Sequence, residues 1–361
     1  MKSPISFVQS VMIMMLSTGL LNHVIIIPIL LDAAGRDAWM SIVLAGICSL
    51  AWIAVLRIGI RQVNKQPIFE MLSNAYPPFV GKVLAGAAGI YLFVICTLTT
   101  RDTVYWIHLT FSPETPIVVF TLIFLLISVV NAYLGIQSIA NTASILLPIV
   151  VLLGFFVMFS NTPHKDYSLL KPFLAHGMQP VWNGVIYVGA GFVEIIMLLF
   201  MQHHIQSRLM YMHLLILIVI LAGLTIGPLI GGIVEFGVDE ADKLRYPAYE
   251  EWRLLTIGRY IEHMDFFSVY QWFSGAFIRM SITMFLILDV FRIQSNKGKA
   301  WVLGCLYAAI LFLASIPISD QVFMRTMSSY VLPFSFWGVL LYSVVVVGLI
   351  LLARLRGRTV S

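Results

Sequence analysis

The stretch Ser17-Thr18-Gly19-Leu20-Leu21-Asn22-His23-Val24-Ile25-Ile26-Ile27-Pro28 decides the fold. It lies in the middle of the first long apolar segment, with a helix breaker near each end and two polar side chains between them. In hydrocarbon, an unsatisfied backbone group costs several kcal/mol, so a spanning helix is interrupted only where protein or a water-lined cavity receives the freed groups. The stretch therefore predicts a broken first span beside a binding site.

The composition indicates a polytopic membrane protein. Of the 361 residues, 60% are hydrophobic and 11% are charged, and the mean hydropathy is +0.94, whereas soluble domains carry roughly 25% charged residues. The net charge of +5 is spread over short loops, so it gives no sign of nucleic-acid binding. The N-terminal apolar run is too long for a signal peptide and lacks a cleavage site, which indicates a retained first span.

Ten segments are apolar over the length of about 20 residues that a spanning helix needs. Because five is odd, two sets of five enter the membrane from opposite sides, which predicts an inverted repeat with halves at about 5–160 and 178–355 in a single all-α transmembrane domain, 1–361. Basic residues are more frequent in the loops on the side of the termini, which predicts cytoplasmic termini. The expected spans are 8–31, 38–56, 79–100, 118–134, 143–159, 181–201, 210–234, 266–288, 300–316 and 331–352.

The sixth span leads the second half and is interrupted like the first. Gly189 and Gly191 break its apolar run, and Glu194 follows at membrane depth. Interruptions at matching positions of the two halves are the sequence sign of a substrate site near the bilayer midplane. The pattern therefore predicts discontinuous helices 1 and 6 that face each other across a polar pocket.

On the first span, the candidate ligand residues are Gly19, Asn22 and His23. Pro28 lacks an N–H and leaves carbonyls near Val24 free, so the exposed helix ends suit a zwitterion. The alternative is a proline kink packed against a neighbouring helix. His23 is either a group that titrates near neutral pH or a hydrogen-bonded structural histidine.

Glu194 and Arg279 are the opposite charges deepest in the expected spans. A charge at the bilayer centre costs at least about 2.5–3.5 kcal/mol, so each should face the bundle interior and have a partner. Either they form a structural salt bridge, or Arg279 receives a substrate carboxylate in a bidentate fork. Gly275, Arg279 and Thr283 recur at every fourth position and share one face of the eighth helix.

Arg101 and Asp102 follow the apolar run of the third span, where they form either a gating pair or an interfacial anchor. In the long loop after the seventh span, residues 249–263 predict a short amphipathic helix at the outer surface. No His, Cys or carboxylate spacing indicates a metal site, and His203-His204 has the character of an interfacial pair. No phosphate loop or nucleophile–base pair stands out, so we expect no enzyme activity and no cofactor.

Six passages, in their order and spacing, carry a resemblance to a known family. They are Pro28 with Ala33-Ala34-Gly35-Arg36-Asp37-Ala38-Trp39, then Lys65-Gln66-Pro67, Thr100-Arg101, Leu170-Lys171-Pro172, Gly191-Phe192-Val193-Glu194 and residues 272–279. Over about 5–356 the chain resembles the spore germination permeases, the B-type membrane subunits of nutrient germinant receptors. The resemblance implies the ten-helix inverted-repeat fold of the amino acid/polyamine/organocation transporter superfamily.

What the resemblance implies for function is a small-molecule germinant, often an amino acid, bound between the broken first and sixth helices. Residue by residue it points to Leu21, His23, Ile95, Gly191, Arg279 and Thr283. Where relatives often have Gly-x-Gly ahead of the first-helix proline, this chain has Leu21 and His23. The implied partners are an A-type membrane subunit and a C-type lipoprotein in the spore inner membrane. The alternative is an amino acid transporter coupled to H⁺ or Na⁺.

Overall fold

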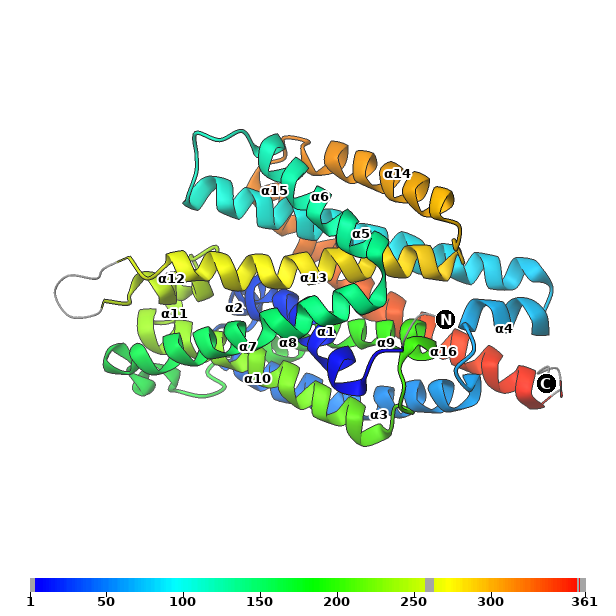
Figure 1. Ribbon diagram of the computed structural model, residues 1–361. Helices are drawn as coiled ribbons and strands as arrows, with labels where there is room; N and C mark the ends of the chain where they lie inside the picture. Colours follow the sequence, from blue (N-terminus) through cyan, green and yellow to red (C-terminus); the bar gives the residue numbers. More distant parts are fainter. Residues whose placement is uncertain (1–3, 257–262, 356, 358–361) are drawn as a thin grey trace.

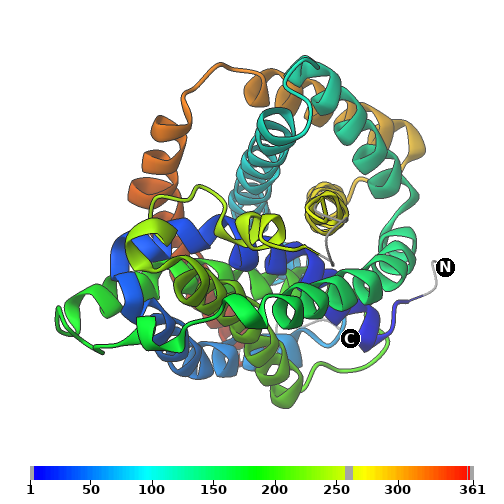
Figure 2. The same ribbon diagram turned by 90° about the vertical axis from the view of Figure 1, so that its left-hand side faces the viewer.

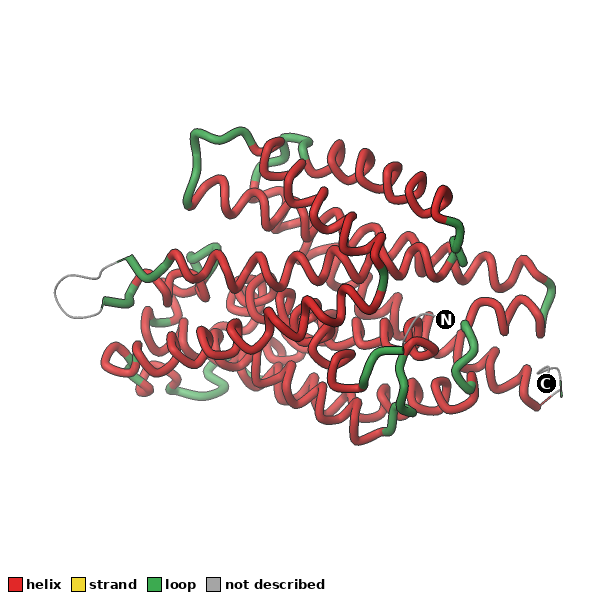
Figure 3. The backbone as a smooth tube through the Cα atoms, in the orientation of Figure 1, coloured by secondary structure: helices red, strands yellow, loops and turns green. Residues whose placement is uncertain are grey.

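The computed structural model describes residues 4–256, 263–355 and 357. Within these ranges the chain forms helices and short loops, and its β-structure is a single isolated bridge between Ile5 and Ile205 (Figure 3). Nine helical runs in the described part of the chain are long and apolar enough to cross a membrane. The protein is therefore a multi-pass integral membrane protein.

The first of these runs, residues 7–63, contains two of the expected spans. A turn separates them, because Gly35 adopts a φ of 53°, a conformation that side chains with a Cβ rarely take. The count of ten spans and the inverted repeat stay predictions. The run consists of α1 (Phe7–Leu20), the π-helical turn η1 (Leu21–Ile25), α2 (Ile26–Ala34), the 3₁₀ turn η2 (Gly35–Asp37) and α3 (Ala38–Val63).

The remaining elements follow in chain order as mostly long helices. Short 3₁₀ turns, η3 (Thr162–His164) and η4 (Tyr167–Leu170), lie in the loop before α8. The others are α4 (Ile68–Ala75), α5 (Pro78–Thr110), α6 (Ile117–Leu134), α7 (Ile136–Ser160), α8 (Gln179–Phe192), η5 (Val193–Ile196), α9 (Met197–Met201), η6 (Gln202–His204), α10 (Tyr211–Phe236), α11 (Val238–Ala241), α12 (Pro247–Arg253), α13 (Phe266–Val290), α14 (Asn296–Ala314), α15 (Asp320–Thr326), η7 (Met327–Val331) and α16 (Leu332–Leu355).

The helices form an elongated bundle with two distinct ends (Figure 1). Both chain termini and α4 lie at one end, which we call the terminal end, and α11 and α12 lie at the other, the α12 end. α13 runs through the middle in contact with α1, α5, α6 and α7, and Figure 2 shows it end-on. The arrangement places Arg279, near the middle of α13, in the interior of the bundle.

The breaks predicted in the first and sixth spans are changes of helical winding, and the chain does not unwind at either. In the first span the N–H of Ile26 bonds to the carbonyl of Leu21, which closes the π turn η1 ahead of Pro28. In the sixth, the 3₁₀ turn η5 follows Gly191. A third irregular turn, the π turn η7, precedes Pro333 in the last span. Each π turn lies just before a proline, which cannot donate the next helical hydrogen bonds.

The amphipathic helix predicted over 249–263 is shorter in the structure, where α12 ends at Arg253. Its apolar residue Trp252 packs with Leu255 against Val157 of α7. The segment 257–262 lies outside the described residues. α12 is thus held against the bundle at the α12 end.

Candidate ligand-binding site

A small cavity, here called the central cavity, lies where the irregular turns η1, η5 and η7 meet. Leu21 and Ile25 of η1, Glu194 of η5, and Met327 and Val331 of η7 all line it. Its volume is about 30 Å³, which is room for one or two water molecules. The remaining lining residues come from α5, α8, α13, α15 and α16 and are Tyr91, Val94, Ile95, Leu98, Thr99, Ala190, Arg279, Phe323, Leu332 and Ser335.

Glu194 and Arg279 meet at the wall of the central cavity in a two-point ion pair. Nη1 and Nη2 of Arg279 each lie 2.5 Å from one carboxylate oxygen of Glu194, and the side chains are only 3% and 2% exposed. Arg279 also donates from Nε to the hydroxyl of Thr99 and from Nη1 to the carbonyl of Ser17, both at 2.9 Å. The contact expected from the sequence is present, and the guanidinium ties the first, third, sixth and eighth spans together.

The sixth span approaches the first span closely at one glycine and the last span at another. A Cβ on Gly191 would lie 1.7 Å from the side-chain oxygen of Asn22, and one on Gly189 would lie 2.4 Å from the ring of Phe336. Among the described residues, neither polar atom of the buried Asn22 side chain has a hydrogen-bond partner. Since buried polar groups in folded proteins are normally paired, Asn22 is a candidate for bonding to a ligand or water.

A second and larger cavity, here called the lateral cavity, lies on the other side of the first span. It has a volume of about 460 Å³ and lies among α1, η1, α7, α10, α12 and α13. Three of the predicted ligand residues, Gly19, His23 and Gly275, line this cavity and not the central one. The ring of His23 makes a 2.8 Å hydrogen bond through Nδ1 to the carbonyl of Leu224.

Seven of the predicted ligand residues are thus divided between the two cavities, and Asn22, Gly189 and Gly191 line neither. Leu21, Ile95, Glu194 and Arg279 surround the central cavity, whereas Gly19, His23 and Gly275 surround the lateral one. Thr283 lines neither, since its hydroxyl donates to the carbonyl of Arg279 at 2.8 Å and contacts the thiol of Cys96. The reason for the division is that successive residues of a helix point in different directions, so a polar stretch on one span faces several neighbours.

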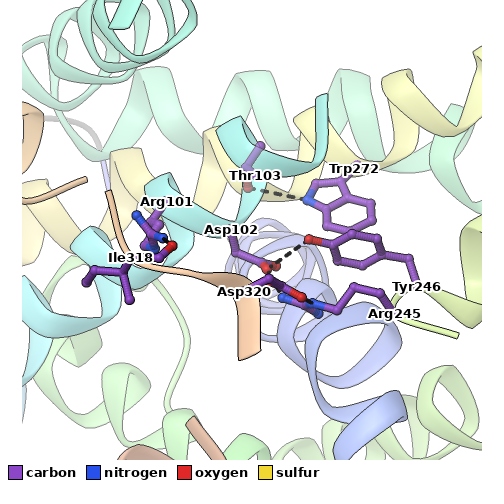
Figure 4. Close-up of polar contacts among 8 residues, drawn as sticks. All are labelled: Arg101, Asp102, Thr103, Arg245, Tyr246, Trp272, Ile318 and Asp320. Carbon is purple, nitrogen blue, oxygen red and sulfur yellow. Dashed lines mark hydrogen bonds and ion pairs between the residues drawn. The ribbon is translucent and has the colours of Figure 1, made fainter. Parts of the chain in front are cut away.

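A charged network, which we call the Asp102 network, joins α5, α15 and the segment between α11 and α12 (Figure 4). Arg245, from the segment between α11 and α12, donates from Nη2 to Asp102 of α5 at 2.6 Å and from Nε to Asp320 of α15 at 2.9 Å. The hydroxyl of Tyr246 donates to Asp102 at 3.3 Å. Arg101 does not pair with Asp102, because its guanidinium binds the carbonyls that precede α15 instead, at Ile316 and Ile318.

Phe323 connects the Asp102 network to the central cavity. Its ring lines the cavity, and the guanidinium carbons of Arg101 and Arg245 lie 5.6 and 5.9 Å from the ring centroid. Burial lowers the pKa of Arg245, but the carboxylates of Asp102 and Asp320 outweigh this, so its pKa is above its usual value. Arg245 therefore stays charged at any physiological pH and holds α5 and α15 together over the cavity.

A comparison with protein-family models finds the spore germination protein family, whose model matches residues 3–323. The chain belongs to this family. It is 43% identical over 354 residues to spore germination protein XB of Bacillus anthracis, covering 98% of this chain and 99% of that protein. It is 23% identical to spore germination protein KB of Bacillus subtilis (strain 168), over 75% of each chain. The spore germination permease resemblance expected from the sequence is confirmed.

Among solved structures, this chain is similar to Mhp1, a nucleobase-cation-symport-1 family transporter in a closed conformation with bromovinylhydantoin bound. The TM-score is 0.59, at 11% sequence identity, over 98% of this chain and 95% of that one. At such low identity the likeness shows the fold alone. The all-α membrane architecture predicted from the sequence is thereby confirmed as a transporter-like fold.

Proposed function

We propose that this protein is the membrane subunit of a germinant receptor that binds a small nutrient, an amino acid, in the central cavity. The observation that carries the proposal is the buried Glu194–Arg279 ion pair at the wall of the cavity. Its two charges are arranged to take the carboxylate of a zwitterion on Arg279 and its ammonium on Glu194. An arginine fork matches a carboxylate in two hydrogen bonds, which gives geometric selectivity.

Because the central cavity is small, binding of the nutrient requires a conformational change. A volume of about 30 Å³ holds no amino acid, so the nutrient binds a state in which Glu194 and Arg279 have separated. A ligand that binds only the open state shifts the population towards it, by as much as its affinity for the two states differs. That shift is the signal that the receptor passes on.

Opening towards the α12 end requires the Asp102 network to separate. Arg245 must release Asp102 and Asp320, and the ring of Phe323 must leave the wall of the cavity. In this proposal Asp102 and Arg101 act as gating residues, and Pro28 serves to set the winding of the first span. The central cavity is then reached from the side on which α12 lies.

The partners we propose are an A-type membrane subunit and a C-type lipoprotein, in the spore inner membrane, with both termini in the cytoplasm. The relatives found are named as spore germination proteins, which supports a place in the same process. The apolar side chains exposed along the spans are the surface that the lipid bilayer covers.

The decisive experiment replaces both members of the pair, as Glu194→Leu with Arg279→Met. Because no charge is left unpaired, the double variant should fold about as well as the wild type. It should nevertheless lose the germination response to amino acids in spores whose own copy of the gene is deleted. Arg279→Lys should also lose the response, since an ammonium cannot reproduce the fork.

The matched control is the exposed pair Glu70–Arg292 at 2.7 Å, replaced as Glu70→Gln with Arg292→Gln. These changes should leave both thermal stability and germination unchanged, because exposed ion pairs contribute little. If the folded Glu194→Leu, Arg279→Met variant germinates normally, the pair is structural and the central cavity is not the nutrient site.

A second candidate function is transport of an amino acid coupled to H⁺ or Na⁺. It is favoured by a carboxylate, Glu194, at the wall of a central cavity in a transporter-like fold, because such a group can carry a proton. Uptake of labelled amino acid by proteoliposomes separates the two functions. Sustained accumulation that stops when the ion gradient is collapsed would contradict a receptor without transport.

A further inference from the structure

We propose that His203, His204 and Asp289 bind a transition-metal ion of the Zn²⁺ class at the terminal end of the bundle. The two histidines belong to η6, at the end of the sixth span, and Asp289 lies one residue before the end of α13. Sequence spacing did not indicate this set, because Asp289 comes 85 residues after His204. The expectation of no metal site, drawn from spacing alone, overlooked this contact between two spans.

The donor atoms of the three side chains already converge on one point. Nε2 of His203 lies 3.1 Å from one oxygen of Asp289, and Nε2 of His204 lies 3.0 Å from the other. All the ligand atoms of the set lie within 4.8 Å of one another. Ligands about 2.0–2.2 Å from a tetrahedral Zn²⁺ ion are roughly 3.4 Å apart. Small side-chain movements therefore suffice to place an ion among them.

One ring nitrogen of His203 has no partner in this cluster. Nδ1 of His203 is buried and has no hydrogen-bond partner among the described residues. Nε2 of His203 faces the carboxylate of Asp289, so a metal ion bound at Nε2 would replace the proton in this contact, and Nδ1 would carry the hydrogen of the neutral ring. The centroids of the His203 and His204 rings are 4.0 Å apart, and the ligand atoms of the set lie close enough for one ion to contact both rings.

The chemistry of the donors selects the kind of ion. Two imidazoles and one carboxylate suit Zn²⁺, Co²⁺ or Ni²⁺, whereas Mg²⁺ and Ca²⁺ prefer sites built only of oxygen ligands. Three protein ligands leave a fourth position for water. The side chains are 13–21% exposed, so an ion can enter from the aqueous side. The set is thus a site open to exchange with the surrounding solution.

A bound ion would tie three spans together at the terminal end. It would link η6 to the end of α13, and η6 is already joined to the segment before α1. The N–H of Ile5 donates to the carbonyl of His204, and the N–H of Gln206 donates to the carbonyl of Ile5, both at 2.9 Å. The ion would therefore strengthen the closure of this end, opposite to the Asp102 network.

The test is Zn²⁺ titration of the full-length protein, purified in detergent and freed of metal with a chelator. We expect one Zn²⁺ per chain, an unfolding temperature that rises with Zn²⁺ but not with Mg²⁺, and a Co²⁺ absorption spectrum typical of tetrahedral nitrogen and oxygen ligands. His204→Ala and Asp289→Asn should each weaken binding at least tenfold. Zn²⁺ should also slow hydrogen exchange in the segments 5–7 and 203–206.

The control variant is His176→Ala. His176 is an exposed histidine in the loop before α8, outside the proposed metal site. It should leave the affinity for Zn²⁺ unchanged. If the wild type binds no stoichiometric Zn²⁺, or if His204→Ala and Asp289→Asn bind as tightly as His176→Ala, the three residues form only an ion pair and the proposal is wrong. The Co²⁺ spectrum of the wild type decides the matter without any variant, should a variant fail to fold.

Discussion

The central and lateral cavities lie on opposite faces of the same π turn, and they differ in both size and chemistry. The central cavity measures about 30 Å³ and has a buried two-point ion pair in its wall, whereas the lateral cavity measures about 460 Å³ and has Lys165 and Glu251 among its mainly apolar lining residues. Beside the central cavity, Gly189 and Gly191 have no room for a methyl group. In the wall of the lateral cavity, Gly223 and Gly227 face open space.

The difference teaches that cavity size alone does not locate the site. A charge deep in a membrane protein is costly and is retained where it does something. At the wall of the central cavity, the two charges that we propose bind the ligand are bonded to each other in the structure. The larger cavity has room for a molecule of ordinary ligand size, and its lining includes the charged residues Lys165 and Glu251. The following predictions test whether the two regions differ as this reasoning requires.

The largest effect should come from Arg279→Met as a single change. It leaves the carboxylate of Glu194 buried without a partner, which costs about 3–5 kcal/mol of stability. Arg253→Met, which removes the exposed partner of Glu250 near the lateral cavity, should cost less than about 1 kcal/mol. The measurement is thermal unfolding of each purified variant in the same detergent.

One outcome would contradict this prediction for the two ion pairs. If Arg279→Met unfolds at the wild-type temperature, then water reaches Glu194 freely and the central pair is not the buried feature described here. Adding Glu194→Leu to Arg279→Met should restore most of the lost stability, because the uncompensated charge is then removed.

How much of this comparison was predictable from the sequence depends on the kind of contact. The Glu194–Arg279 pair was predictable, because two opposite charges deep in apolar spans must find each other. The interruptions of the first and sixth spans were predictable from Gly19, Pro28 and the glycines before Glu194. The structural form of these interruptions was not predictable, because a change of helical winding and an unwound segment are both associated with glycine and proline in the sequence.

Two features of the site were not predictable, for different physical reasons. Leu21 lines the central cavity and His23 lines the lateral one, because their side chains point in different directions. The π turn η1 sets these directions, since its extra residue rotates the side chains that follow. The Asp102 network joins residues 143 and 75 positions apart. In the sequence, Arg245 lies in a loop with many charged residues, and charged side chains in such loops are usually exposed to water.

The second prediction compares two glycines. Gly191→Ala should destabilise the protein by about 1–3 kcal/mol, because its methyl group would overlap the side chain of Asn22. Gly227→Ala should be neutral or stabilise it by up to about 1 kcal/mol, since a helical alanine is favoured over glycine and space is free there. Thermal unfolding of both variants in parallel checks this. Equal effects of the two changes would mean that the first and sixth spans are not packed as closely as described.

The third prediction concerns Glu251 of α12, which borders the lateral cavity. Burial raises the pKa of Glu251 well above its usual value, the carboxylate of Glu235 raises it further, and Lys165 opposes them. The native state therefore binds a proton more tightly than the unfolded state. This contribution to stability is fully present below the usual pKa of 4.5 and is lost as the pH rises towards the raised pKa.

Glu251→Gln should remove this dependence on pH, because an amide resembles the protonated acid and does not titrate. Between pH 5 and 8, the wild type should lose up to about 1 kcal/mol per pH unit relative to the variant. Unfolding temperatures of the two proteins over this range provide the measurement. Parallel curves would show that Glu251 is ionised in the native state, with Lys165 shared between two carboxylates.

The smallest expected effect is that of His23→Ala, on the lateral side of the first span. Loss of the hydrogen bond from its ring to the carbonyl of Leu224 should cost about 1 kcal/mol. Because His23 does not line the central cavity, the amino acid concentration that gives half-maximal germination should stay within about threefold of the wild type. Germination dose–response curves of spores carrying His23→Ala or Leu21→Ala would settle which face binds the nutrient. A tenfold shift for His23→Ala, with none for Leu21→Ala, would place the nutrient in the lateral cavity, because only the occupied face can change the affinity.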